Sequence, residues 1–319
     1  MRGDVAKVRG ACYAVGVMSR TVAYHRLPTE QRHPRTHALD RLTTPQFVRL
    51  MSRDHTHALR AVERAHPQIV HAIQRLADRL HRGGRIVLIG AGTSGRLGVL
   101  EAAECPPTFH TPPSLIHAII AGGRRAVFRS QEGTEDDHAA GTRAIRHTVR
   151  PEDVIVGISA SGVTPYVEAA LRAAARRGAQ TILITCNPRP PIPAHVRICL
   201  PVGPEILAGS TRLKAGTATK LTLNMLTLGT MVRLGKTYGN LMVNVRPTSR
   251  KLKARALGMI RALTGVSHRR AAEALQQAHG QVKAALVMLT RNVGYRTAKR
   301  LLTQQPDLLH RNLPPPARR

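Results

Sequence analysis

The stretch Arg85-Ile-Val-Leu-Ile-Gly-Ala-Gly-Thr-Ser-Gly-Arg96 decides the fold class of this chain. A short apolar run rich in β-branched residues ends there in a glycine-rich turn, which is typical of a buried strand that leads into a helix. Helical patterns such as Thr164–Arg177 separate further apolar runs at Leu115–Ile120, Asp153–Ser159, Thr181–Cys186 and Arg197–Val202. We therefore expect an α/β fold of three layers, αβα, with a parallel sheet of about five strands.

Helical periodicity surrounds this strand region on both sides. Apolar residues recur every three or four positions over residues 46–80, and Pro67 is expected to divide that segment into two helices. Residues Thr211–Leu234 predict another long helix. Past Pro247 the pattern predicts a small bundle of three helices, at Ser267–Ala278, Gln281–Leu289 and Tyr295–Leu302.

These patterns predict four segments. They are a disordered leader, the sheet domain with its N-terminal helices, a small three-helix domain and a flexible tail, at residues 1–28, 29–247, 248–302 and 303–319. The apolar stretch near the start is too short for a signal peptide, so a cytoplasmic location is expected, and Met18 is an alternative start to Met1. No apolar run is long enough to predict a membrane span.

Composition narrows the class of protein further. The 319 residues suffice for a sizeable core, and the four cysteines form no CxxC pair, which disfavours a disulfide scaffold. The net charge is +31, with 49 Lys+Arg against 18 Asp+Glu. Arginine richness from a GC-rich genome explains this better than nucleic-acid binding does, because aromatic residues make up only 3%. We therefore expect no nucleic-acid partner.

The glycine-rich turn carries the first candidate binding residues. It matches G-x-G-x-x-G, but no acid lies between Glu104 and Glu132, where a nicotinamide site needs one. Two hydroxyls beside the free N–H groups of a helix start instead suit a phosphate monoester. The candidates are Thr93, Ser94 and Arg96; the alternative is a tight turn that binds nothing.

A second turn with hydroxyl side chains follows the third predicted strand. Its candidate binding residues are Ser159, Ser161 and Thr164. Because both turns follow strands of one parallel sheet, they are expected at the same edge, where ligands bind. The alternative is ordinary capping of the next helix by Thr164 ahead of Pro165.

Two carboxylates are candidates for acid–base chemistry. Glu104 is expected at the end of a helix, just before Pro106 and Pro107, where its charge opposes the helix dipole and its pKa should rise. Glu101, one turn earlier, is expected on the solvated surface. In the acidic segment 132–137, helix capping explains the last two aspartates, whereas Glu135 is either part of that helix start or a base for proton abstraction.

Two cations, Arg212 and Lys214, are expected at the start of the helix predicted for Thr211–Leu234. The helix dipole disfavours positive charge there, so either an anionic ligand compensates or both side chains extend into solvent. The 16 histidines show no metal-binding spacing, and the sequence predicts no metal site.

Several longer sequence motifs resemble those of the N-acetylmuramic acid 6-phosphate etherase family. They run in family order from about residue 29 to residue 302, and the most specific are Ile89–Gly98, Ala103–Phe109, Glu132–Asp137 and Gly209–Thr217. Val163 and Asn244 stand where that family usually has Arg and Asp. A vertebrate relative, glucokinase regulatory protein, carries two such domains, and this chain has room for one.

The resemblance implies a sugar isomerase (SIS) domain, a homodimer with active sites near the subunit interface, and no cofactor. It also implies cleavage of the lactyl ether of N-acetylmuramic acid 6-phosphate to N-acetylglucosamine 6-phosphate and D-lactate, in cell-wall sugar recycling. Glu104 would be the acid and Glu135 the other catalytic carboxylate. The alternative is a regulator that binds a sugar phosphate without turnover, for which neither glutamate is needed.

Overall fold

Five parallel strands form the central sheet, as the apolar runs predict. They lie in the order β2-β1-β3-β4-β5 and comprise β1 Ile86–Gly90, β2 Ile116–Ile120, β3 Val154–Ile158, β4 Gln180–Thr185 and β5 Val196–Cys199. The computed structural model describes residues 23–146, 148–305 and 308–309. Gly90 pairs in register with Ile120 on one side and Ile158 on the other, so β1, β2 and β3 end level at one edge. That edge carries the candidate site.

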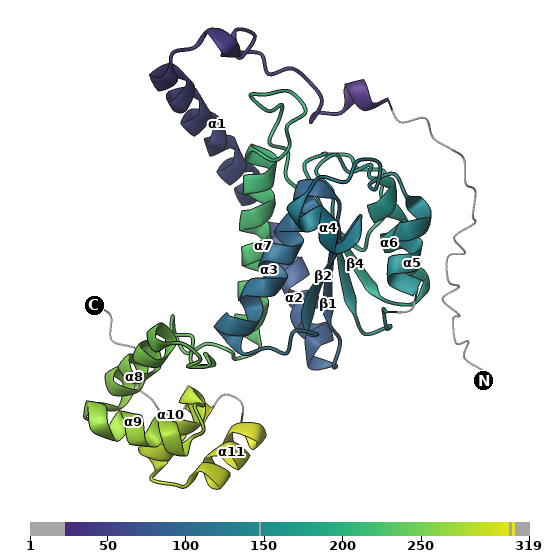
Figure 1. Cartoon of the computed structure of the whole chain (residues 1–319). Coiled ribbons are helices and arrows are strands. Elements are labelled where there is room, and N and C mark those ends of the chain that lie inside the picture. The colour runs from purple at the N-terminus through teal and green to yellow at the C-terminus, as the bar shows by residue number, and fades with distance from the viewer. Residues whose placement is uncertain (1–22, 147, 306–307, 310–319) are drawn as a thin grey trace, which may run out of the picture.

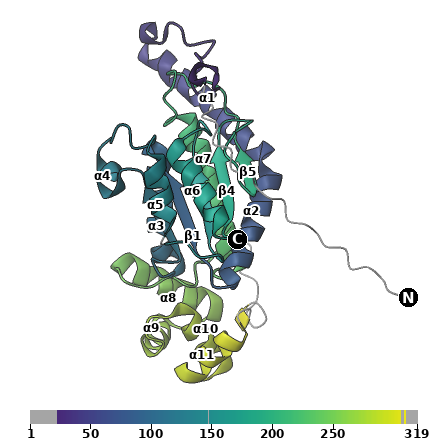
Figure 2. The same cartoon turned by 90° about the vertical axis from the view of Figure 1, so that its right-hand side faces the viewer.

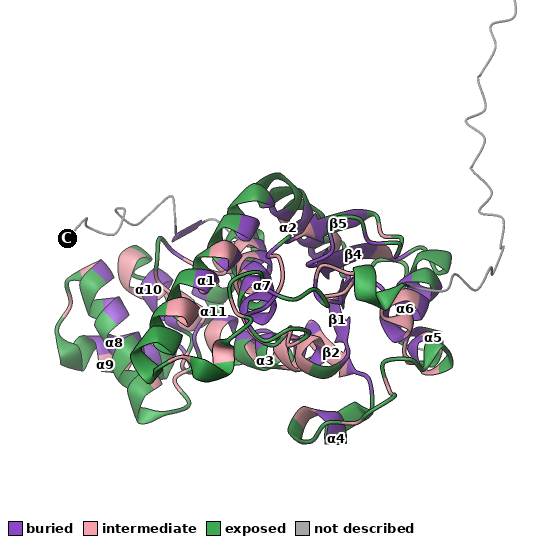
Figure 3. Cartoon of the chain, turned by 90° about the horizontal axis from the view of Figure 1, so that it is seen from above, coloured by how far each residue is buried: buried purple, intermediate pink, exposed green. Residues whose placement is uncertain are grey.

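Helices cover both faces of the sheet (Figures 1 and 2). One hydrophobic cluster contains alternate strand residues such as Leu88 and Val156 with side chains of α1 Thr44–Arg64, α2 His66–His81, α3 Gly92–Phe109 and α7 Lys214–Arg233. The opposite alternation, for example Val87 and Ile155, packs with α5 His138–Arg146 and α6 Pro165–Arg176. Burial on both faces explains the nearly continuous apolar strands, and Figure 3 shows the buried residues along them. The predicted αβα fold class is confirmed.

The predicted break at Pro67 is confirmed. Helix α1 ends at Arg64 and α2 starts at His66, with Pro67 in its first turn, where proline costs no hydrogen bond. A capping box between Thr43 and Gln46 starts α1. The N-terminal half of α1 projects from the body of the domain (Figure 1).

Between residues 248 and 305, all of which are described, the chain forms four helices rather than the expected three. The additional helix is α8 Arg250–Thr264, which Ser249 caps by accepting the N–H of Leu252; the others are α9 His268–Gln277, α10 Val282–Arg291 and α11 Tyr295–Gln304. They enclose their own hydrophobic cluster, which includes Ile260, Leu275 and Leu286. The high charge of α8 hid its apolar face, because only one face of the helix is buried.

The proposed boundaries at residues 29, 247 and 302 stay predictions. Residues 1–22 of the expected leader, and 306–307 and 310–319 of the expected tail, lie outside the described residues. Within the described part of the chain, no helix is long and apolar enough to cross a membrane. The same residues contain no group of three or more His, Cys, Asp or Glu side chains that could hold a metal ion.

Candidate active site

The glycine-rich turn joins β1 directly to α3. A Cβ at Gly95 would lie 2.5 Å from the side chain of Ile120 and 2.8 Å from the carbonyl oxygen of Gly90, so only glycine allows this close approach. Ala91, the N-cap residue, gives α3 no side-chain cap. The first N–H groups of the helix are thus available to an anion, and Thr93 and Ser94, both half-buried, lie in that first turn.

The second hydroxyl turn leaves β3, which neighbours β1 in the sheet. Ser159 Oγ lies 2.7 Å from Thr164 Oγ1 and 3.4 Å from Ser161 Oγ, so the three hydroxyls form one cluster. Ser159 Oγ also accepts the N–H of Gly162 at 3.0 Å. Thr164 is the N-cap residue of α6, as the capping alternative expects, yet its side chain accepts no helix N–H. The structure therefore brings both turns to the same edge of the sheet.

Glu135 borders a cavity of about 80 Å³, here called the acidic-loop cavity. It lies between the glycine-rich turn and the loop before α5, and it is lined by Ala91, Gly92, Arg96, Ala121, Ala126, Ser130, Gln131, Glu132, Gly133, Thr134 and Glu135. Burial, with the neighbouring charges of Asp136, Glu132 and Glu30, raises the pKa of Glu135. A raised pKa makes this carboxylate a stronger base.

The other residues around Glu135 have structural partners. The carbonyl oxygen of Glu135 accepts the N–H of Tyr166, which ties the acidic loop to α6. Asp137 accepts the N–H of Ala140 at 2.7 Å and so caps α5, as the capping alternative expects. Arg96 donates from Nε to the carbonyl oxygen of Val127 at 3.1 Å while lining the acidic-loop cavity. It therefore places a cation in the acidic-loop cavity.

Glu104 does not lie at the end of a helix, and that prediction is wrong. Helix α3 continues through Pro106 and Pro107 to Phe109. Cys105 and Phe109 pack into the core on this last turn, and their burial offsets the hydrogen bonds that the two prolines cannot make. The Glu104 side chain is exposed on the surface of α3.

Glu101, by contrast, is buried, with 6% of its surface exposed, so the expectation of a solvated side chain is wrong. Asn224 Nδ2 donates to its carboxylate at 2.7 Å, and Thr227 Oγ1 donates to the other oxygen. Both donors lie on α7, which packs against α3. Hydrogen bonds satisfy the charge that burial would otherwise make costly.

Lys214 does not face an anion site, contrary to the expectation. Its side chain is 1% exposed, and Nζ donates to Asp54 Oδ1 of α1 at 2.9 Å. His33 Nε2 lies 3.3 Å from the same oxygen. The N–H groups of Lys214 and Ala215 donate to the buried carboxylate of Glu205, so an internal acid occupies the N-terminus of α7. The conflict with the helix dipole is resolved inside the protein.

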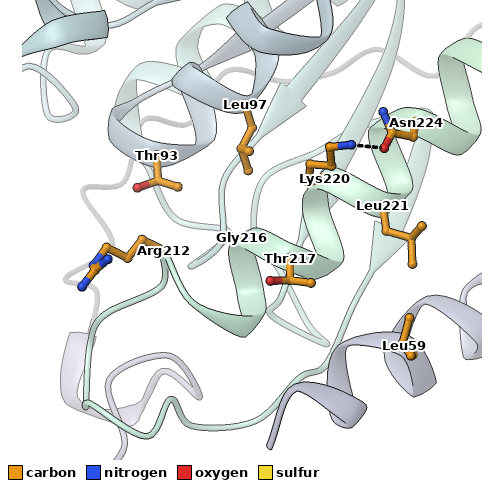
Figure 4. A pocket seen from close by; sticks show the side chains of 9 residues that line it. All are labelled: Leu59, Thr93, Leu97, Arg212, Gly216, Thr217, Lys220, Leu221 and Asn224. Atoms are coloured by element: carbon orange, nitrogen blue, oxygen red, sulfur yellow. Dashed lines mark hydrogen bonds between the residues drawn. The ribbon is translucent and has the colours of Figure 1, made fainter. Parts of the chain in front are cut away.

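Arg212 precedes α7 and lines a second, larger cavity of about 510 Å³ (Figure 4). This α3–α7 cavity is bounded by side chains of α1, α3 and α7, namely Leu59, Thr93, Leu97, Arg212, Gly216, Thr217, Lys220, Leu221 and Asn224. Lys220 and Asn224 are not among the binding residues that the sequence predicts. Their only signal was a polar pair spaced i, i+4 within an otherwise apolar-periodic helix.

Known proteins resemble the chain over most of its length. N-acetylmuramic acid 6-phosphate etherase of Nostoc sp. is 50% identical over 281 residues, which cover 87% of this chain and 91% of that protein. The etherase of Rubrobacter xylanophilus is 48% identical, covering 86% and 93%. This chain belongs to the N-acetylmuramic acid 6-phosphate etherase family.

Two family models match the sheet domain. Residues 68–175 match the N-terminal SIS domain of glucokinase regulatory protein, and residues 135–229 match the SIS domain. Among solved structures, a phosphoheptose isomerase from Francisella tularensis is 15% identical with a TM-score of 0.47, covering 60% of this chain and 98% of that chain. The expected SIS domain is confirmed.

The structure shows the surroundings of Val163 and Asn244, the two residues that depart from the usual etherase motifs. Val163 is buried beside the second hydroxyl turn, so an apolar side chain occupies the place of the family's usual arginine. Asn244 donates from Nδ2 to the carbonyl oxygen of Lys236 at 2.9 Å. Neither residue contacts Glu104 or Glu135 through any hydrogen bond or ion pair of the described residues.

Proposed function

We propose that this protein cleaves the D-lactyl ether of N-acetylmuramic acid 6-phosphate, which makes it a carbon–oxygen lyase. The products are N-acetylglucosamine 6-phosphate and D-lactate. The observation that carries the proposal is the identity of about half the residues with etherases across nearly their whole length. The non-catalytic regulator has no such support.

The reaction requires an acid and a base. Glu135 removes the C2 proton of the ring-opened sugar, which the C1 aldehyde acidifies. The C3–oxygen bond then breaks, and Glu104 protonates the departing lactate oxygen. Water next adds across the C2–C3 double bond, with its hydroxyl on C3 and its proton on C2, while the two carboxylates exchange roles. As written, the chemistry uses these two carboxylates and needs no cofactor.

The 6-phosphate is assigned to the sheet edge between the two hydroxyl turns. Ser94 and Thr93 supply hydroxyls beside the uncapped first turn of α3, and the cluster of Ser159, Ser161 and Thr164 faces it from the neighbouring strand. Arg96 and Arg212, which line the two cavities beside this edge, contribute positive charge. Lys214 does not bind the substrate, because Asp54 holds its ammonium group.

The positions of the two glutamates support a homodimer with shared active sites. Glu104 lies twelve residues beyond Gly92 on α3, about 18 Å along the helix axis at 1.5 Å per residue. Glu135 borders the same cavity as Gly92. Two side chains so far apart cannot act on adjacent carbons of one sugar, so we infer that a second chain supplies one of them.

The surface around Glu104 suits such a partner. Leu100, one turn before Glu104 on the same side of α3, is 45% exposed, and Leu228 and Val232 of α7 are each 50% exposed. On α1, Leu59 is 54% exposed. These apolar side chains lie on three helices that pack together, and a second copy that covered them would also cover Glu104. Location in the cytoplasm, where sugar phosphates are formed, completes the proposal.

Incubation of the purified protein with N-acetylmuramic acid 6-phosphate tests the function. We expect D-lactate and N-acetylglucosamine 6-phosphate in equal amounts, and ¹⁸O from labelled water at C3 of the sugar. Glu135→Gln serves as the control for contaminating activity. Binding of the substrate without release of lactate would favour the regulator instead.

A further inference from the structure

The two cavities differ in charge although they adjoin the same turn. Gly92 borders the acidic-loop cavity, and Thr93, the next residue, borders the α3–α7 cavity. The acidic-loop cavity has two glutamates and one arginine in its lining. The α3–α7 cavity has two cations, Arg212 and Lys220, and none of its described lining residues is acidic. The α3–α7 cavity is therefore suited to an anion.

The ammonium group of Lys220 is held in place by a chain of hydrogen bonds. Its Nζ donates to Asn224 Oδ1 at 2.5 Å, and Asn224 Nδ2 donates to the buried carboxylate of Glu101 (Figure 4 shows the first contact). Thr227 donates to the same carboxylate and fixes it. The amide thus links a buried anion to an exposed cation. Since a lysine ammonium has three N–H donors, two remain for a ligand.

The rest of the lining specifies what kind of anion fits. Leu59, Leu97 and Leu221 provide an apolar wall beside the two cations. A small organic acid with a methyl group uses both features, whereas a phosphate uses only the charge. The cluster of Ser159, Ser161 and Thr164, which suits the phosphate, does not line this cavity.

We propose that Lys220, together with Arg212, binds the lactyl carboxylate of the substrate in the α3–α7 cavity, with the lactyl methyl group against its leucines. This rests on the proposed function, since it assigns a place to the acid that the reaction releases. Lys220 is then a specificity-determining residue that distinguishes the lactyl sugar from the product.

Calorimetric binding of two sugars to a protein that cannot turn over tests the assignment. The background is Glu135→Gln, and the ligands are N-acetylmuramic acid 6-phosphate and N-acetylglucosamine 6-phosphate. Lys220→Met is compared with Lys253→Met, an exposed lysine on α8. Lys220→Met removes a charge-assisted hydrogen bond. It should therefore lower the affinity for the lactyl sugar by about 10- to 100-fold, and the affinity for the product by less than about threefold.

The outcomes separate the possibilities. Lys220→Arg keeps a cation and should retain most of the affinity for the lactyl sugar, and Lys253→Met should change neither constant. Equal weakening of both sugars by Lys220→Met, or no weakening of either, overturns the proposal. Failure of the wild-type protein to release lactate would refute the proposed function instead, and the binding constants would still decide the role of Lys220.

Discussion

Two lysines six residues apart on one chain segment show how surroundings decide a residue's role. Lys214 is buried and paired with Asp54, whereas Lys220 is exposed in the α3–α7 cavity and held by Asn224. The same side-chain charge therefore stabilises the fold at the first position and is free to bind a ligand at the second. Sequence alone offered no reason to prefer Lys220.

The first prediction concerns the buried pair. Lys214→Met should lower the free energy of unfolding by about 3–5 kcal/mol, because it leaves the Asp54 carboxylate buried without its partner. Urea unfolding measures this, with exposed Lys251→Met as the matched control. Asp54→Asn combined with Lys214→Met should recover part of the loss. A loss below about 1 kcal/mol in the single variant would show that the pair contributes little.

The second prediction separates the roles of the two carboxylates. Glu104→Gln should stop lactate departure, because the amide cannot protonate the leaving oxygen. Proton abstraction by Glu135 does not require Glu104, so exchange of the C2 proton with deuterated solvent should continue. Mass spectrometry of recovered substrate measures the exchange. Lactate release at the wild-type rate would remove Glu104 from the mechanism.

At the scale of elements, the start of α3 is the feature that creates the site. The helix begins without a side-chain cap directly after β1, so its N–H groups and the hydroxyls of its first turn meet at the sheet edge. Close packing at Gly90 and Gly95 requires the glycines of the motif. A local sequence rule thus produces the anion-binding geometry.

The third prediction tests that element. Ser94→Ala should raise KM for N-acetylmuramic acid 6-phosphate, by the equivalent of about 1–3 kcal/mol for one charge-assisted bond, and leave kcat nearly unchanged. Thr142→Ala on α5 is the control, since it removes a hydroxyl that only contacts the carbonyl oxygen of His138. If N-acetylmuramic acid without phosphate were cleaved as fast as the phosphate, the assignment of this turn would be wrong.

The fourth prediction concerns α10, whose Lys283 donates to the carbonyl oxygen of Gly235 just after α7. Burial, with the nearby charge of Lys236, lowers the pKa of Lys283 to about 8 from its ordinary value of 10.5. Between those values the unfolded chain binds a proton that the folded chain does not. The free energy of unfolding should therefore rise as the pH increases from 8 toward 10.5.

Urea unfolding at several pH values across this range measures the effect. The Lys283→Met variant should not show this increase in the free energy of unfolding with pH, whereas the variant of exposed Lys251, Lys251→Met, should show it. A parallel slope in both variants would mean that other groups cause it.

At the scale of the whole molecule, the proposed pairing of Glu104 with Glu135 requires a second chain. Glu104 is exposed on α3 beside apolar side chains, far along the helix from the cavity of Glu135. A second copy that covered this face would bury the apolar side chains. It would also supply the second carboxylate of the proposed catalytic pair. The same contact would thus stabilise the dimer and complete the catalytic pair.

The fifth prediction follows from shared sites. Glu104→Gln and Glu135→Gln should each be inactive alone, yet an equal mixture that exchanges subunits should recover about one quarter of wild-type activity, because half the dimers then hold one intact site of two. Lactate release after mixing measures the recovery, and a mixture kept from exchanging is the control. No recovery in fully exchanged dimers would place both glutamates of a site on one chain.

The sequence by itself determined the fold class, the strand positions and the two hydroxyl turns. Apolar runs must be buried, and the close approach of α3 to the strands requires glycine in the turn, so local pattern and element agree at β1 and α3. The family motifs likewise predict Glu104 and Glu135 as the catalytic carboxylates. Sequence periodicity also placed the break at Pro67, because the cost of proline in a helix is local.

Only the tertiary structure decided which charges are buried and which face a cavity. The sequence predicted a solvated Glu101 and a substrate-binding Lys214, but Asn224 and Asp54, far away in the sequence, satisfy these charges inside the protein. The continuation of α3 through Pro106 likewise depends on core packing by Phe109. Such outcomes depend on contacts between distant segments, and no local pattern encodes which partner a charge will meet.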